Sequence, residues 1–247
     1  MWLEILKGLV LGLIQGLTEF LPVSSSGHLL LAERLGLTPP NVLVNLILHL
    51  ATLLAVCIAM RREVWGWIRH PLSRRSRWLL LMCLPTAGVA FALAKLTPEL
   101  VEGAWLPLGF LATSALLLIA RTLPRGDRPL TASNALLTGL VHGVAVLPGL
   151  SRSGATVTAM RLQGIPQEEA VTLSFLSSIP VIVGGIVLEI IEGVALDGVS
   201  PALLVTATIT AFLSGLAGLK WMLKAFGRSY LVFGIYTLAL AIASAFV

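Results

Sequence analysis

Two polar, glycine-rich breaks interrupt long apolar stretches of the chain, and they resemble each other. The first reads QGLTEFLPVSSSGH from Gln15 to His28, and the second contains LPGLSRSGAT and ends at Thr156. A shift of 127 positions aligns Gly12, Gly16, Ser24, Ser26 and Gly27 with Gly139, Gly143, Ser151, Ser153 and Gly154. Charged and hydroxyl side chains are tolerated at membrane depth only where they face protein or a water-filled cavity. A duplicated break therefore predicts a functional site between two membrane repeats.

Composition supports this reading, since 57% of the 247 residues are hydrophobic and only 12% are charged. Soluble domains carry about 25% charged residues. The apolar stretches are too long for transmembrane β-strands, which alternate over about 10 residues. We therefore expect an all-α polytopic membrane protein. The net charge of +5 comes without interleaved aromatic and basic residues, so we expect no nucleic acid partner.

Six apolar segments have about the length that a helix needs to cross a bilayer. They cover residues 42–60, 78–95, 105–121, 169–191, 201–219 and 229–247. The broken segments 5–36 and 131–161 have arms that are each too short to cross alone, which predicts two re-entrant hairpins. The chain then forms one membrane domain of two repeats, 1–124 and 125–247, each with one re-entrant hairpin and three transmembrane helices. The alternative is eight ordinary spans.

Basic residues predict the orientation of these segments. The loops 61–77, 121–133 and 220–228 fall on one side and hold 12 of the 17 Lys and Arg residues. By the positive-inside rule this side is cytoplasmic. Because three spans invert the second repeat, the first hairpin enters from outside, the second enters from inside, and both termini lie outside.

Arg152 dominates the second break. A guanidinium is a planar fork of donors that suits phosphate oxygens, and a helix starting near Ser153 would direct its N–H groups at an anion. Ser151, Gly154 and Thr156 are expected to line the same anion site. The structural alternative is that Arg152 only neutralises Glu19 across the repeat interface.

The first break carries a carboxylate, hydroxyls and an imidazole. Gln15 and Glu19 are one helical turn apart, and a buried carboxylate can hold a divalent cation or act as a general base. A serine of the 24–26 cluster with His28 is a candidate nucleophile and base. The structural alternative is that Ser26 caps the following helix.

Two other histidines, one in a predicted span and one in the second broken segment, are expected to have a structural role. His49 and His142 lie on apolar segments, where a lone histidine is expected to be a packing residue.

The two breaks resemble the signatures of the undecaprenyl-diphosphate phosphatase family, the bacitracin-resistance type of bacterial inner membranes. The resemblance extends to LILHLATLLAV after the first signature and LSFLSSIPVIVGG after the second. It implies hydrolysis of undecaprenyl diphosphate to undecaprenyl phosphate and inorganic phosphate, with Mg²⁺ or Ca²⁺ as cofactor. The chain departs from the family pattern at two positions, because Gln15 is the neutral option for the first acidic residue and His142 replaces an expected glutamine.

The resemblance assigns roles residue by residue. It implies Glu19, Ser25, His28 and Arg152 as catalytic residues, with Glu19 also the metal ligand. It implies Gln15, Ser24, Ser26, Ser151, Ser153, Gly154 and Thr156 as substrate-binding residues.

From these residues we expect Ser25 or His28 to be the nucleophile, with Arg152 clamping the phosphates. The expected partners are a polyprenyl diphosphate, membrane lipids and, in a homodimer, a second copy of the chain. The rival function is a lipid flippase or small-molecule transporter, because transporters share broken helices in inverted repeats.

Overall fold

The computed structural model describes residues 1–193, 198–225 and 230–247, and all regular secondary structure in these ranges is helical. The prediction of an all-α fold is confirmed. The helices are α1 Trp2–Phe20, α2 Ser25–Arg34, α3 Val42–Ala59, α4 Arg61–Arg69, α5 Arg74–Leu96, α6 Pro98–Val101, α7 Leu106–Thr122, α8 Ala132–Val144, α9 Arg152–Leu162, α10 Gln167–Glu192, α11 Pro201–Ala225 and α12 Tyr230–Ser244.

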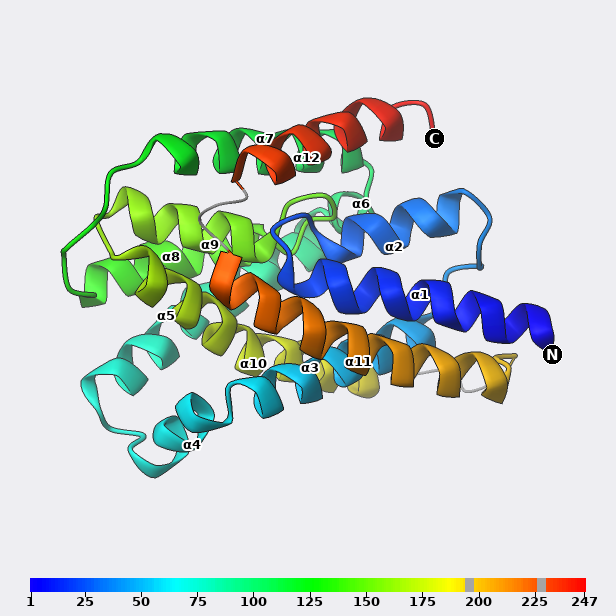
Figure 1. The fold of residues 1–247 in the computed structure, drawn as a ribbon, viewed down its shortest axis with the longest axis horizontal. Coiled ribbons are helices and arrows are strands. Elements are labelled where there is room, and N and C mark those ends of the chain that lie inside the picture. The colour runs from blue at the N-terminus through cyan, green and yellow to red at the C-terminus, as the bar shows by residue number, and fades with distance from the viewer. Residues whose placement is uncertain (194–197, 226–229) are drawn as a thin grey trace.

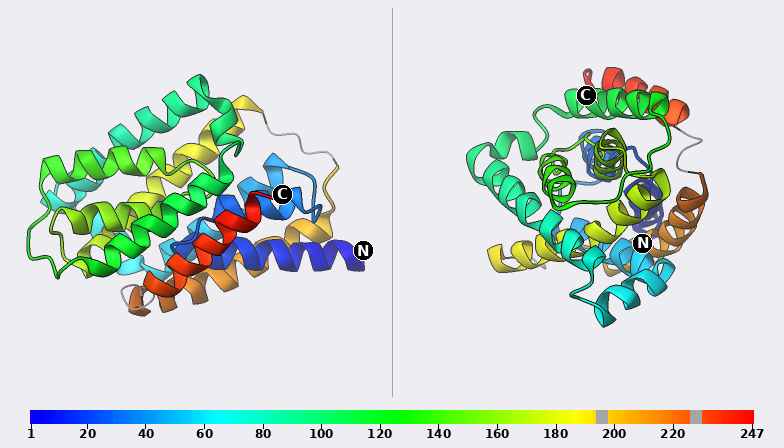
Figure 2. Two further views of the ribbon diagram at one scale, coloured as in Figure 1. Left: turned by 90° about the horizontal axis from the view of Figure 1, so that it is seen from above. Right: turned by 90° about the vertical axis from the view of Figure 1, so that its left-hand side faces the viewer.

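Both broken segments fold as helical hairpins, α1 with α2 and α8 with α9. The two hairpins point towards each other, tip to tip, in the middle of the molecule (Figure 1). The right-hand view of Figure 2, along the long axis, shows the hairpins near the centre of the molecule with the other helices around them. The expectation that neither arm is long enough to cross is wrong for α1, which has 19 residues because its helix begins at Trp2.

Within the described ranges, four helices are long and apolar enough to span a membrane: α3, α5, most of α10, and α11. The chain is therefore a multi-pass membrane protein. The spans predicted at 105–121 and 229–247 correspond to shorter apolar helices, α7 with 17 residues and α12 with 15. Residue 229 lies outside the described residues, as does Arg228 of the predicted basic loop.

The two halves exchange their packing partners. Helix α1 of the first hairpin packs on α11 of the second half, and α8 of the second hairpin packs on α5 of the first. Helices α7 and α12 pack on each other. This reciprocal arrangement is what two intertwined repeats predict, and the inversion of the repeats across the membrane stays a prediction.

Glycines of the aligned set allow close helix contacts in both halves. A Cβ on Gly12 would lie 2.6 Å from the Ala207 carbonyl oxygen of α11, and a Cβ on Gly143 would lie 2.6 Å from Cβ of Val89 on α5. Small residues let membrane helices approach this closely. The glycines therefore join each hairpin to the opposite half.

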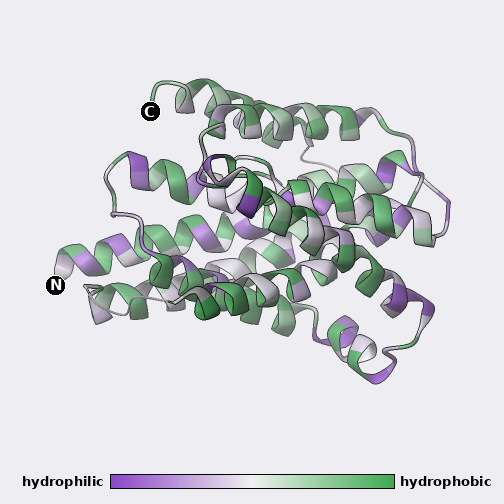
Figure 3. Ribbon diagram, turned by 180° about the vertical axis from the view of Figure 1, so that it is seen from behind, coloured by the Kyte–Doolittle hydropathy of each residue, from purple (hydrophilic) through white to green (hydrophobic). Residues whose placement is uncertain are grey.

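The basic residues 61–77 gather at one end of the molecule, away from both termini. Figure 3 shows hydrophilic colour around the turns there and hydrophobic colour over most helical surfaces. Part of this segment, expected as loop, forms the short helix α4, on which the Arg69 guanidinium lies 4.9 Å from the ring centroid of Trp65. The predicted sidedness requires the basic residues to lie together in this way, and the sidedness itself stays a prediction.

Candidate active site

The two breaks share one backbone design, in which a serine caps the helix that follows. Ser24 Oγ accepts a hydrogen bond from the Gly27 N–H at 3.3 Å, and Ser151 Oγ accepts one from the Gly154 N–H at 3.1 Å. Helix α9 begins at Arg152, one residue before the expected start. The structural alternative, in which Ser26 caps the helix after the first break, is wrong, because the capping residue is Ser24, two residues earlier.

The two breaks are also joined directly. Ser24 Oγ accepts a second hydrogen bond, at 3.0 Å, from the N–H of Gly149 in the opposite break. Gly27 lies so close that an added Cβ would be 2.7 Å from the same nitrogen. Ser24 has φ of 70°, which makes it the one non-glycine residue with positive φ in the described ranges. Such backbone strain persists only where the surrounding structure enforces it, here through the contact between the breaks.

Glu19 is the centre of the polar contacts at this junction. Its Oε2 accepts hydrogen bonds from Ser25 Oγ at 2.6 Å and from Gln15 Nε2 at 3.1 Å. Its Oε1 forms an ion pair with Nη2 of Arg152, from the other hairpin. Glu19 is only 6% exposed. A buried carboxylate is stable only with this kind of pairing and hydrogen bonding.

The pairing of Arg152 with Glu19 confirms the contact that the structural alternative required, but it does not use the whole guanidinium. Nη1 of Arg152 is buried and has no hydrogen-bond partner among the described residues. Arg161 of the same helix provides the contrast, since both its terminal nitrogens donate to backbone carbonyls of residues 120–124. Arg161 therefore has the contacts of a structural arginine, whereas Arg152 keeps a donor for a ligand.

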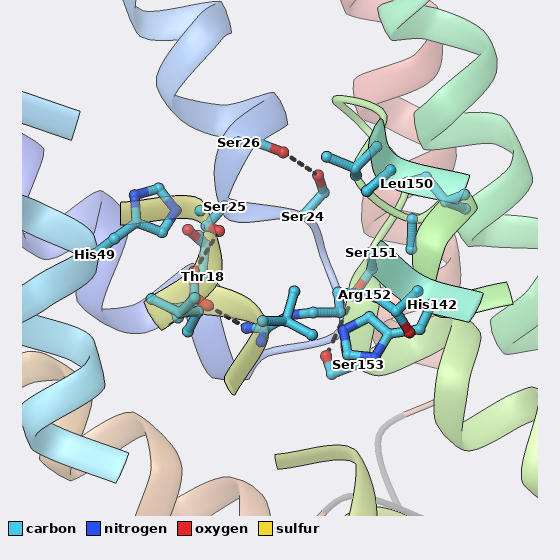
Figure 4. Close-up of a pocket in the computed structure, with 18 of the residues that line it drawn as sticks. Thr18, Ser24, Ser25, Ser26, His49, His142, Leu150, Ser151, Arg152 and Ser153 are labelled. Atoms are coloured by element: carbon cyan, nitrogen blue, oxygen red, sulfur yellow. Dashed lines mark hydrogen bonds and ion pairs between the residues drawn. The ribbon is translucent and has the colours of Figure 1, made fainter. Parts of the chain in front are cut away.

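A cavity of about 270 Å³ opens at this junction. Seven of the predicted site residues line it: Glu19, Ser24, Ser25, Ser26, Ser151, Arg152 and Ser153. Figure 4 shows Thr18, Ser25 and His49 on one side and His142, Ser151 and Ser153 on the other. The cavity also has apolar walls from α5, from α10 and from Ala145, Val146 and Leu150 of the second break, which suit a ligand with a polar head and an apolar tail.

Four predicted site residues lie outside the described lining. Gln15 and Gly154 are buried behind Glu19 and Ser151. Thr156 Oγ1 donates to the Arg152 carbonyl oxygen at 2.8 Å, so it contacts the backbone of Arg152 and not the cavity. Their direct contact with substrate stays a prediction that this geometry does not favour.

His28, the fourth of these residues, faces away from the cavity. Its Nδ1 is 2.7 Å from the Ser24 carbonyl oxygen, and its Nε2 is 2.7 Å from the hydroxyl of Tyr236 on α12. The ring also stacks on Tyr236. The geometry gives His28 the position of a residue that holds the strained turn, rather than the position of a nucleophile.

Two histidines expected to be packing residues line the cavity instead. His49 Nδ1 is 2.8 Å from the Asn45 carbonyl oxygen of its own helix, which makes Nδ1 the donor and leaves Nε2 as an acceptor. His142 lines the opposite wall. The signal in the sequence was a polar residue on an otherwise apolar helix, which does not reveal which neighbour it faces.

Comparison with known proteins identifies the family of the chain. The family model described as "Bacitracin resistance protein BacA" matches residues 8–243. Proteins named undecaprenyl-diphosphatase are 36% identical in Korarchaeum cryptofilum, with 98% of each chain covered, and 34% identical in Carboxydothermus hydrogenoformans, with 93% of this chain and 92% of the relative covered. A third, from Desulfatibacillum aliphaticivorans, is 35% identical over 90% of this chain and 89% of its own. The chain therefore belongs to the bacitracin resistance protein BacA family.

Proposed function

We propose that this protein is an integral membrane phosphatase that hydrolyses undecaprenyl diphosphate to undecaprenyl phosphate and inorganic phosphate, recycling a lipid carrier of cell-wall synthesis. The observation that carries the proposal is the hydrogen bond of 2.6 Å from Ser25 Oγ to Glu19 Oε2, in a cavity that also holds Arg152. A hydroxyl nucleophile needs an adjacent base, and a phosphoryl group needs a fixed cation to stabilise its charge.

In this mechanism Ser25 Oγ attacks the terminal phosphorus and passes its proton to Glu19. The bond from that phosphorus to the bridging oxygen breaks, and undecaprenyl phosphate leaves with the electron pair and takes the proton from Glu19. Water then attacks the phosphoserine and passes a proton to the Glu19 carboxylate. The Ser25 oxygen leaves, takes this proton from Glu19 to become a hydroxyl again, and inorganic phosphate is released. Arg152 stabilises the phosphoryl oxygens through both steps.

The cation that the sequence predicts, Mg²⁺ or Ca²⁺, fits these residues only if the protein and the substrate phosphates coordinate it together. The described residues contain no group of three or more His, Cys, Asp or Glu side chains placed to hold a metal. Oε1 of Gln15 is buried beside Glu19 and lacks a hydrogen-bond partner within the described ranges. Glu19 and Gln15 would hold the cation together with substrate phosphates, the arrangement common for Mg²⁺. When bound, the cation would neutralise phosphate charge.

The alternative of a flippase or transporter is not favoured, since the relatives described above are named for a phosphatase. Phosphate release in detergent micelles separates the two functions, because an enzyme needs no second compartment. We expect the purified protein to release inorganic phosphate from undecaprenyl diphosphate, and a protein that releases none contradicts the proposal.

Substitution of the nucleophile tests the assignment of Ser25. We expect Ser25→Ala to lower kcat by at least about 10³-fold, since the attacking oxygen is removed. Ser26→Ala is the matched control, because Ser26 Oγ lies 3.4 Å from Ser24 Oγ and does not contact Glu19 within the described structure. Its expected loss is less than about tenfold. Near-normal turnover by a folded Ser25→Ala variant would exclude Ser25 as the nucleophile.

A further inference from the structure

His142 of α8 is buried without the partners that an imidazole needs. The residue is 2% exposed, and neither ring nitrogen has a hydrogen-bond partner among the described residues. A neutral imidazole presents one donor and one acceptor, and leaving both unpaired in a protein interior is costly. Because His142 lines the cavity, a ligand there can satisfy it.

Arg152 has a second unpaired donor on the same cavity. Its Nη2 pairs with Glu19, whereas its Nη1 is buried without a partner. Three of the five buried side-chain polar atoms that lack a partner in the described structure belong to His142 and Arg152. Two of these nitrogen atoms, the ring N–H of His142 and Nη1 of Arg152, are donors, which indicates a place for oxygen atoms of a ligand.

The other repeat shows why these nitrogens are free. Gln15 is the counterpart of His142 at a shift of 127, and its amide donates to Glu19 and to Thr52. The counterpart of Glu19 is Val146, which also lines the cavity but cannot accept a hydrogen bond. The second hairpin therefore keeps the donors and lacks the internal acceptor, which is the composition of an anion site.

We propose that His142 and Nη1 of Arg152 form a subsite for the phosphoryl group that Ser25 does not attack, an inference that rests on the proposed function. Figure 4 shows His142 across the cavity from Ser25. A diphosphate has two phosphoryl groups joined by one oxygen, so one group at Ser25 leaves the other to extend towards the opposite wall. In this arrangement Arg152 binds both groups, since its Nη2 pairs with Glu19 beside Ser25 and its Nη1 is the unpaired donor left for the subsite.

Direct binding of two simple anions tests the subsite by a readout that is independent of undecaprenyl diphosphate hydrolysis. Inorganic pyrophosphate has two phosphoryl groups and inorganic phosphate has one, and calorimetry of the detergent-solubilised protein at fixed free Mg²⁺ measures both affinities. We expect the wild type to prefer pyrophosphate. His142→Met should reduce that preference about tenfold, the scale of one hydrogen bond to a charged group, and change the phosphate affinity less than about threefold.

Two controls accompany this variant. His142→Gln retains an amide donor like that of Gln15 and should keep the preference within about threefold. His70→Gln changes an exposed loop histidine and should leave both affinities as in the wild type. The subsite is refuted if the wild type shows no preference, if His142→Met retains it, or if both anions lose affinity equally.

A measurement on the wild-type protein covers the case in which His142→Met does not fold. The chain has four histidines, so ¹⁵N-histidine labelling gives a small set of ring signals that single substitutions assign. We expect saturating pyrophosphate to shift the His142 ring nitrogens, and unchanged signals overturn the subsite. Failure of the phosphatase itself is seen separately, as absent hydrolysis by a wild type that still binds pyrophosphate.

Discussion

The two breaks have nearly the same backbone and opposite chemistry. Each has two serines whose hydroxyl oxygens lie 3.4 Å apart, and the first of each pair caps the next helix. Between those serines stands Ser25 in one break and Arg152 in the other. In the proposed mechanism the first break thus supplies the nucleophile and the carboxylate, and the second supplies the cationic side chain.

This difference shows that neither repeat contains a complete site. Glu19 contacts Ser25 from its own hairpin and Arg152 from the other, and these contacts meet only where the two tips join. The two breaks present polar side chains on similar backbones, and differences at a few positions give each break a separate role. Because the two hairpins meet tip to tip, we expect them to enter the membrane from opposite sides.

The orientation of the chain in the membrane, from which the entry sides of the hairpins were predicted, has an all-or-none test. In a chain without Cys57 and Cys83, we expect a cysteine at Ser73 to be protected from an impermeant thiol reagent in intact cells, because the basic end is cytoplasmic. A cysteine at Ala104, an exposed residue between α6 and α7, is the control and should be labelled. Labelling at Ser73 with protection at Ala104 reverses the orientation.

The carboxylate of the first break should have the largest graded effect on catalysis. We expect Glu19→Gln to lower kcat by about 10²–10⁴-fold, the range for a general base, and to remove most of the metal dependence. Gln15→Glu should keep activity and tighten metal binding, because a second carboxylate adds charge. Phosphate release against Mg²⁺ or Ca²⁺ concentration measures both effects.

Position 146 is the matched control, since it aligns with Glu19 in the second break. Val146→Ala should change kcat less than about tenfold, because it removes only apolar contacts. If Glu19→Gln keeps full turnover and the wild-type metal curve, Glu19 is a structural partner of Arg152 and the two breaks do not divide the chemistry as argued.

Arg152, the cationic side chain of the second break, should have the next largest effect on catalysis. We expect Arg152→Lys to lose at least about 10²-fold in kcat, because an ammonium cannot contact Glu19 and two phosphoryl groups as a fork does. Arg161→Lys is the control on the same helix, and it should lower the melting temperature with little change in kcat, since Arg161 binds backbone carbonyls. Equal kinetic losses in both variants would show that Arg152 acts through folding alone.

The smallest effects are expected where the breaks are alike, at the capping serines. Ser151→Ala should lower the free energy of unfolding by about 1 kcal/mol, the usual cost of a lost cap. Ser24→Ala should cost about 2 kcal/mol, because Ser24 also accepts from Gly149. Denaturant unfolding in detergent compares the two, and a larger loss at Ser151 would mean that the contact between the breaks contributes little.

The sites of Glu19 and Arg152 were predictable because each is an ionised group in an apolar chain, which has few stable environments. The role of His28 was less predictable. His28 follows Ser25 by three residues, which on a helix separates their directions by about 60°. Which of them faces the cavity depends on α12, whose Tyr236 binds the His28 ring.

The sequence by itself determined the helical class, the hairpins, the order of the long helices and the ionised residues of the site. Each of these follows from local composition, because apolar length specifies helices in a membrane and glycine, proline and serine specify breaks. Only the tertiary structure decided that His49 and His142 face the cavity and that His28 faces Tyr236. The face that a membrane helix buries is set by contacts with distant helices, and a uniformly apolar helix carries no periodic signal of that face.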